Sequence, residues 1–206
     1  MDPLIVWIDR LSAWASGPAV WGIFLSGAAI YLIASWRLRL VALLAQYFFI
    51  GIMFTRLFSE RPEMALLKTL VGWLACAAIY LSARIRQESM EEEQRQVGRA
   101  ADRPFRLVSL LMMTTIAYLA SQHYALPFVS GDLALTCFLL LVLALLFIGT
   151  EQDVVVIGIG VLNLLAGLDI FYSVQDPGLL VTGLLIMVNL LVALAISYLT
   201  VVEVPE

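Results

Sequence analysis

The chain has 206 residues, of which 62% are hydrophobic and 14% are charged, and its formal net charge is −4. Ordinary soluble domains contain about 45–50% apolar and about 25% charged residues, so this composition excludes that class. The apolar residues form runs of 17 to 22 residues, long enough to cross a hydrocarbon core of about 30 Å as helices. These features predict an all-α, polytopic membrane protein, since a transmembrane β-barrel would show shorter, alternating segments.

The N-terminal segment, residues 1–18, has the spacing of an amphipathic helix. Leu4, Trp7, Leu11 and Trp14 fall on one helical stripe, and tryptophan favours the level of the lipid headgroups. We expect an interfacial helix here, although a short helix packed on the membrane bundle would account for the same pattern.

Seven apolar runs then predict about seven transmembrane helices. We expect them at 19–35, 40–58, 65–83, 107–124, 133–149, 154–172 and 179–200. Short links join consecutive runs, with one exception, so helices that follow one another should be antiparallel neighbours. The chain therefore divides into the interfacial helix, a three-helix membrane block at 19–83, a charged cytoplasmic linker at 84–106 and a four-helix membrane block at 107–206.

The basic residues are divided unevenly between the two sides of the membrane. With seven spans, one side receives Arg10, Arg56, Arg61 and Lys68. The other side receives eight arginines: Arg37, Arg39, Arg84, Arg86, Arg95, Arg99, Arg103 and Arg106. Because Lys and Arg are enriched in cytoplasmic loops, we expect the N-terminus outside and the C-terminus in the cytoplasm, in the cell inner (plasma) membrane.

The first three and the last three runs share a layout that suggests an internal duplication. Each set has a span, a very short link, a second span, an acidic link containing proline, and a third span. A shift of 116 residues places Gly51 on Gly167 and Glu60 on Asp176. The fourth run would then join two parallel three-helix repeats, but chance similarity between apolar helices explains the same matches.

Asp169 is a carboxylate inside an otherwise uncharged apolar run. Such a residue is costly in a membrane and faces a partner, a cavity or an ion path. It lies about six residues, or ~9 Å, from the helix midpoint near Asn163, and the two side chains point about 120° apart. Two interpretations stay open: a protonatable relay or ion-site residue, or a carboxylate that pairs with an Arg or Tyr of a neighbouring helix or reaches the interface near Ser173.

Four further polar residues inside the spans are candidates for an ion path. Asn163, Asn189 and Gln46 are amides, which commonly hydrogen-bond between helices, so packing is the favoured interpretation. We expect Asn189 to be the companion of Asp169, since their two helices form a hairpin. For Lys68, snorkelling to the interface is favoured over a buried pair with Asp169.

The sequence holds no pattern typical of a catalytic or metal site. It has no phosphate-binding Gly-rich loop, no HExxH motif and no Ser-His-Asp arrangement around its single histidine, His123,. Cys76 and Cys137 lie in separate apolar runs, which favours buried thiols over a disulfide or a metal pair. We therefore expect no catalytic activity from the chain on its own, no cofactor, no metal and no nucleic-acid partner.

Residues 133–200 resemble a family of small membrane subunits. The resemblance rests on FIGTEQDVVVIGIGVLNLLAGLDIFY, a short acidic turn, and a third helix with Asn189. The family comprises the K-type subunit of respiratory complex I, the C-type subunit of Mrp sodium/proton antiporters and component E of hydrogenase-4-type complexes. It has a glutamate on a proton path in its second helix, and many members have another in the third. Here Asn163 or Asp169 would stand for the first and Asn189 for the second, so the amides depart from the family pattern.

The resemblance implies coupled proton or cation movement within a large assembly. Our leading hypothesis is an accessory membrane subunit of a proton- or cation-translocating complex of the complex I, Mrp or hydrogenase kind. Asp169 would sense or carry a proton, and the partners would be other integral membrane subunits and the lipid bilayer. A standalone small transporter, with a site near Asp169 and Asn189, and a structural membrane scaffold are the alternatives.

Overall fold

The computed structural model describes residues 17–33, 35–58, 62–89, 103–124, 130–175 and 178–202. These ranges contain the helices α2 Gly17–Leu32, α3 Trp36–Leu57, α4 Pro62–Ser89, α5 Arg103–His123, α6 Gly131–Thr150, α7 Val154–Gln175 and α8 Leu179–Val202. Six of the described helices, α3 to α8, are long and apolar enough to cross a membrane. The predicted all-α, polytopic membrane fold is confirmed. Nearly all of the expected interfacial helix at 1–18 and the middle of the linker at 84–106 lie outside the described residues.

The first described helix, α2, is shorter than expected. It has 16 residues, which corresponds to ~24 Å of helix, less than the roughly 30 Å of a hydrocarbon core. It ends at Leu32, and α3 already begins at Trp36. Arg39 turns back over this link, because its Nε donates a hydrogen bond to the carbonyl oxygen of Ile33 at 2.6 Å.

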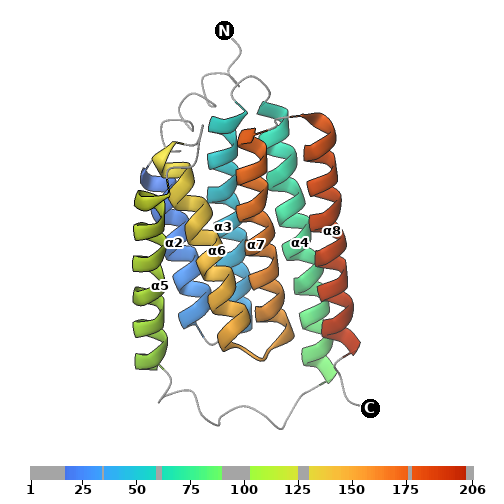
Figure 1. Cartoon of the computed structure of the whole chain (residues 1–206). Coiled ribbons are helices and arrows are strands. Elements are labelled where there is room, and N and C mark those ends of the chain that lie inside the picture. The colour runs from blue at the N-terminus through green and yellow to red at the C-terminus, as the bar shows by residue number, and fades with distance from the viewer. Residues whose placement is uncertain are drawn as a thin grey trace.

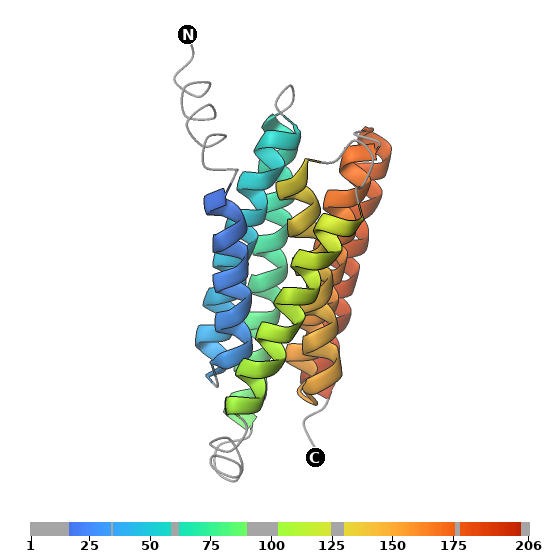
Figure 2. The ribbon, with the colours of Figure 1, turned by 60° about the vertical axis from the view of Figure 1, so that its left-hand side comes forward.

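The helices form two layers (Figure 1). One layer contains α2, α3 and α4, and the other contains α5, α6, α7 and α8, with each helix packed against the next. Contacts of α2 with α6, α3 with α7 and α4 with α8 join the layers, and α5 lies over α6 and the edge of α2 (Figure 2). Consecutive helices are antiparallel, as predicted. We call the end of the bundle at which α2 and α4 begin the upper end, and the end at which α3 and α5 begin the lower end (Figure 1).

Corresponding helices of the two suggested repeats lie side by side and point the same way (Figure 1). The helices of the two layers pair in the same order along each layer. A twofold axis between the two repeats would reverse this order and place α2 against α8 and not against α6. The suggested equivalents also pack differently: a Cβ on Gly51 would meet Thr69 of α4, whereas a Cβ on Gly167 would meet Leu140 of α6. The duplication stays a prediction.

Glycines let α7 approach its neighbours closely. A Cβ on Gly158 would lie 2.5 Å from Cγ2 of Ile196 in α8, and one on Gly160 would lie 3.1 Å from the carbonyl oxygen of Ala144 in α6. Small residues at helix contacts are typical of membrane bundles, where close backbone approach supplies the packing energy. Helix α7, which carries Asp169, is thereby held between α6, α8 and α3.

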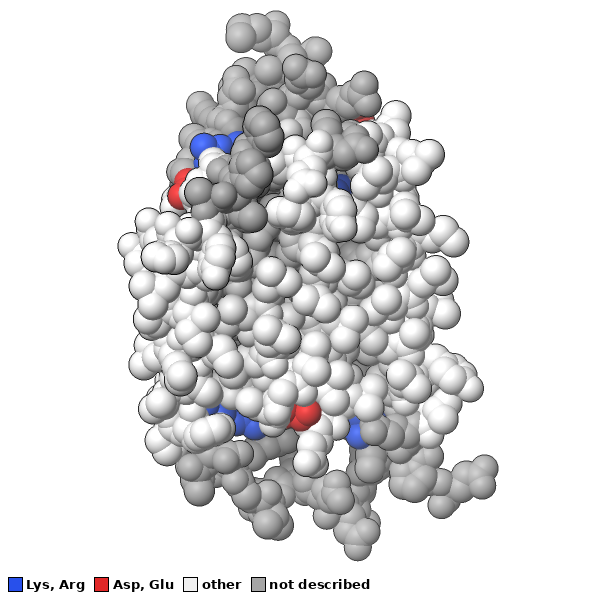
Figure 3. All heavy atoms as spheres, viewed as in Figure 1, with Lys and Arg blue, Asp and Glu red and all other residues white. Residues whose placement is uncertain are grey.

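Charged side chains gather toward the two ends of the molecule and leave an apolar band between them (Figure 3). The outer helices α5 and α8 contribute much of this band. Only 11% of the apolar 18-residue segment of α5 is buried in the bundle, and only 17% of the corresponding segment of α8. A band of this kind is the surface that a lipid bilayer or other membrane subunits cover. Polar groups inside the bundle therefore stand out against an apolar background.

Candidate functional site

Lys68 and Asp169 form a buried ion pair toward the upper end, between α4 and α7. Lys68 Nζ donates hydrogen bonds to Asp169 Oδ1 at 2.5 Å and to Ser173 Oγ at 2.6 Å. The Lys68 side chain is 2% exposed and that of Asp169 is 16% exposed. Asp169 and Ser173 lie on successive turns of α7, so both oxygens reach the same ammonium group. Snorkelling, the favoured interpretation of Lys68, was wrong: its side chain points into the bundle.

Two phenyl rings, of Phe54 in α3 and of Phe58 directly after it, lie against the Lys68 ammonium group on another side. Lys68 Nζ lies 4.4 Å from the ring centre of Phe54 and 5.2 Å from that of Phe58. The faces of these rings attract a cation, and they also keep lipid and water away from it. If Lys68 extended to the membrane interface, its ammonium group would lose its contacts with the Asp169 carboxylate, the Ser173 hydroxyl and both phenyl rings. This loss explains why the side chain stays inside the bundle.

A small cavity adjoins Asp169. Its volume is about 10 Å³, and its polar lining comes from Tyr47, Lys68, Thr69, Asp169 and Asn189. This volume is near the lower limit for one water molecule. Asn189 therefore lies on the same cavity as Asp169, as the hairpin predicted. The Tyr47 hydroxyl is close to Asn189, but within the described residues neither this hydroxyl nor Asn189 Oδ1 makes a hydrogen bond of ordinary geometry.

Gln46 and Asn163 lie one turn further into the bundle. Ile50 and Ala166 line the small cavity from α3 and α7; these helices run in the same direction, and the amides precede those residues by about one turn,. Gln46 is 0% exposed and Asn163 is 1% exposed. Neither amide atom of Gln46, nor Asn163 Nδ2, has a hydrogen-bond partner in the described part of the chain. The interhelical hydrogen bond expected of Gln46 is therefore not formed with the described helices.

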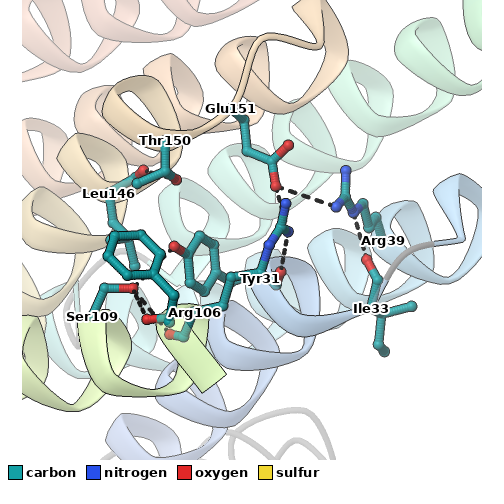
Figure 4. Close-up of polar contacts among 9 residues, drawn as sticks. Tyr31, Ile33, Arg39, Arg106, Ser109, Leu146, Thr150 and Glu151 are labelled. Atoms are coloured by element: carbon teal, nitrogen blue, oxygen red, sulfur yellow. Dashed lines mark hydrogen bonds and ion pairs between the residues drawn. The ribbon is translucent and has the colours of Figure 1, made fainter. Parts of the chain in front are cut away.

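A second ionic cluster lies at the lower end, where α3, α5 and the link between α6 and α7 meet (Figure 4). Glu151 Oε1 forms an ion pair with Arg106 Nη1 at 2.5 Å and accepts a hydrogen bond from Arg39 Nη2 at 3.5 Å. The Arg39 side chain is 5% exposed and that of Glu151 is 12% exposed. One carboxylate is shared by two guanidinium groups, so these three residues carry one net positive charge.

Tyr31 of α2 contacts the Arg106 guanidinium group with its carbonyl oxygen and with its ring. Arg106 Nη1 also donates to the carbonyl oxygen of Tyr31 at 3.1 Å, and the guanidinium carbon lies 5.5 Å from the centre of the Tyr31 ring (Figure 4). The Tyr31 hydroxyl and Ser109 Oγ are hydrogen-bonded at 3.1 Å. Arg106 and Ser109 occupy adjacent turns of α5, so both attach this helix to α2.

The sequence alone does not predict this lower cluster. Its ion pairs join residues far apart in the chain, such as Arg39 and Glu151, and the distribution of arginines predicts only the orientation in the membrane. A signal was present, because Glu151 and Asp153 stand in a short link on the side that has the surplus of arginines. Arg86 Nη1 pairs with Asp153 Oδ1 at 3.0 Å, so both of these carboxylates have arginine partners.

The described residues contain no group of three or more His, Cys, Asp or Glu side chains placed to hold a metal ion. Cys76 and Cys137 are buried and are not joined to each other. Comparison with models of protein families, with curated proteins and with solved structures finds no match to this chain.

Proposed function

We propose that this chain takes part in moving protons or cations across a membrane, as an accessory subunit of an ion-translocating complex of the complex I, Mrp or hydrogenase kind. The observation that carries the proposal is the Lys68–Asp169 pair, two opposite charges enclosed in an apolar bundle. Ionisable residues inside a membrane are costly and mark ion or proton paths. Packed apolar side chains in place of the ion pair would hold α4 and α7 together equally well. The presence of the two charges therefore favours a function that requires them.

The pair is suited to a switch because each charge depends on the other. When Asp169 accepts a proton or a small cation, the Lys68 ammonium loses its counter-charge and keeps only the Ser173 hydroxyl and the two phenyl rings. Lys68 is then free to release a proton or to turn toward the upper boundary. Loss of the proton or cation from Asp169 restores the pair. Asp169 is the binding group in this scheme, and Lys68 is the competing positive charge.

Polar groups at successive depths supply a route from this pair into the bundle. The small cavity leads from Asp169 to Tyr47 and Asn189, and Gln46 and Asn163 follow about one turn deeper. Buried polar groups without a protein partner are commonly satisfied by ordered water. Water at these amides would extend the route toward the centre of the membrane.

Two further features support the remaining parts of the proposal. The resemblance of residues 133–200 to small subunits of ion-translocating complexes, with the exposed apolar faces of α5 and α8, supports packing against other integral membrane subunits. The surplus of arginines at the lower end supports a cytoplasmic position for that end and an outside position for the N-terminus, in the cell inner (plasma) membrane.

The test is the Asp169→Asn variant, produced in the cell that makes the protein and compared with the unaltered chain. We expect proton or cation uptake by membrane vesicles to fall at least about tenfold, while the partners that co-purify in mild detergent stay the same. Asp132→Asn is the matched control. Asp132 is also near the upper end, but its pair with Arg56 is solvent-exposed, with side chains 46% and 42% exposed, so uptake should not change.

The other outcomes point to the alternatives. A purified chain that runs as a monomer and transports ions in liposomes would replace the subunit proposal with a standalone transporter, for which the cavity within one chain is the supporting observation. Lost co-purification with unchanged uptake would identify a structural scaffold. Unchanged uptake with unchanged partners would remove Asp169 from the ion path.

A further inference from the structure

A cleft of about 270 Å³ opens beside the lower ionic cluster, at the corner between α2, α5 and α6. Its described lining is Tyr31, Phe105, Arg106, Gly149 and Thr150. Figure 4 shows Tyr31, Arg106 and Thr150 grouped around this corner. The cleft lies where the apolar band gives way to charged residues, which is the depth of lipid headgroups in a bilayer.

Arg106 has hydrogen-bond donors left for a ligand of the cleft. Its contacts to Glu151 and to the carbonyl oxygen of Tyr31 both use Nη1. Nε and Nη2 donate no hydrogen bond to the described residues. A guanidinium group has five N–H donors in a planar fork that matches phosphate, and this one is already held in place.

The charge around the cleft favours an anion. Among the described side chains, the lower end has five arginines and two carboxylates: Arg37, Arg39, Arg84, Arg86 and Arg106, with Glu151 and Asp153. Outside the buried pair, the described upper end has Arg56 against Glu63 and Asp132. Arg106 is the charged side chain in the described lining of the cleft, so the described charge nearest to a bound group favours an anion.

The cleft also continues into the lipid-facing surface. Phe105 and Val108 of α5 are each 63% exposed, and Leu145 of α6 is 61% exposed. These side chains lie within about one or two turns of Arg106 and Gly149 on the same helices. Acyl chains can lie against this surface while a headgroup occupies the cleft, whereas a free anion would leave the apolar surface unused.

We propose that this cleft binds the phosphate of an anionic phospholipid, with Arg106 as the phosphate ligand and the acyl chains along α5 and α6. The polar end is then recognised by charge and by donor geometry, and the apolar end by the exposed faces of two helices. The site is at the opposite end of the bundle from Asp169, so it does not depend on the proposed ion movement.

The experiment uses the full-length protein in nanodiscs of phosphatidylcholine alone or of equal parts phosphatidylcholine and phosphatidylglycerol. We expect phosphatidylglycerol to raise the thermal unfolding midpoint, and native mass spectrometry to show at least about tenfold preference for it over phosphatidylcholine. Arg106→Gln should remove this preference. Inorganic phosphate added to the detergent-solubilised protein should not reproduce the stabilisation, because it lacks the acyl chains.

A second variant keeps the test decisive if Arg106→Gln fails to fold. A Cβ on Gly149 has no neighbour within 4 Å, so Gly149→Trp fills the cleft and leaves the ion pairs of Arg106 in place. Gly131, at the opposite end of the same helix, is equally open, and Gly131→Trp is the matched control that should retain lipid preference. Equal binding of both lipids, retained preference in Gly149→Trp, or equal stabilisation by inorganic phosphate would each overturn the proposal.

Discussion

The two ionic clusters are buried at opposite ends of the bundle, but they differ in stoichiometry and in the size of the space beside them. Toward the upper end one ammonium meets one carboxylate, and the phenyl rings of Phe54 and Phe58 lie against the ammonium group. At the lower end one carboxylate meets two guanidinium groups beside an open cleft. A buried pair without net charge can change state when one proton or cation arrives, whereas an arginine beside an open cleft is suited to hold an anion at the membrane boundary.

The largest effect is expected from breaking the enclosed pair with Asp169→Ala. Lys68 would keep its ammonium group in a site where its side chain is 2% exposed, with Ser173 as its remaining hydrogen-bond partner. Removing one member of a buried ion pair costs about 3–5 kcal/mol. The free energy of unfolding, measured by denaturant titration in detergent micelles, should fall by that amount.

The control for this prediction removes both charges. Lys68→Met combined with Asp169→Leu replaces the pair by apolar side chains of similar size, so most of the lost stability should return. If the double variant were as unstable as Asp169→Ala, the packing around the site, and not the unpaired charge, would account for the loss. The double variant should still lack ion uptake under the proposed function.

A smaller effect is expected from Glu151→Gln in the open cluster. The two arginines lose a charged acceptor, which corresponds to about 1.5–3 kcal/mol for a hydrogen bond to a charged group. Because Arg106 lines an open cleft, salt ions reach its guanidinium group, and added salt should screen the repulsion between the arginines and reduce the loss. Unfolding measured at low and high salt separates the two clusters: an equal salt response of Asp169→Ala would contradict this difference in access to salt.

The ranges of most helices could be predicted from the apolar runs, because the length of a membrane span is set by the thickness of the bilayer. The pairing of Lys68 with Asp169 could not, since it depends on how α4 and α7 are rotated about their axes. A lysine near the start of a span can snorkel or turn inward with the same sequence. Here Phe54, on a third helix, and Phe58, directly after that helix, favour the inward position.

The position of Asn189 near Asp169 could be predicted, because a short link forces α7 and α8 to be neighbours. The cluster around Glu151 could not be predicted, because no short link joins its partners. Its partners come from α3 and α5, and α3 reaches the α6–α7 link only through the stacking of the two layers. No short link in the sequence predicts that stacking.

Gln46→Leu tests the buried polar groups between the clusters, and we expect it to change the free energy of unfolding by about 1 kcal/mol. Gln46 is 0% exposed and its amide has no described partner, and a buried polar group without a partner is destabilising. We expect the free energy of unfolding to rise, while ion uptake falls if the amide lies on the proposed route. A loss of stability would indicate that Gln46 has a partner that Leu cannot replace, such as a bound water.

The smallest effect is expected from Arg56→Gln, which removes the exposed pair with Asp132 near the upper end. Arg56 Nη1 and Asp132 Oδ2 are 3.5 Å apart, and the side chains are 42% and 46% exposed. Exposed ion pairs contribute about 0–1 kcal/mol, since water solvates either charge after its partner is lost. The same unfolding titration should therefore detect almost no change. A loss as large as that of Glu151→Gln would mean that enclosure does not set the strength of ion pairs in this bundle, and the contrast between the two clusters would have to rest on stoichiometry alone.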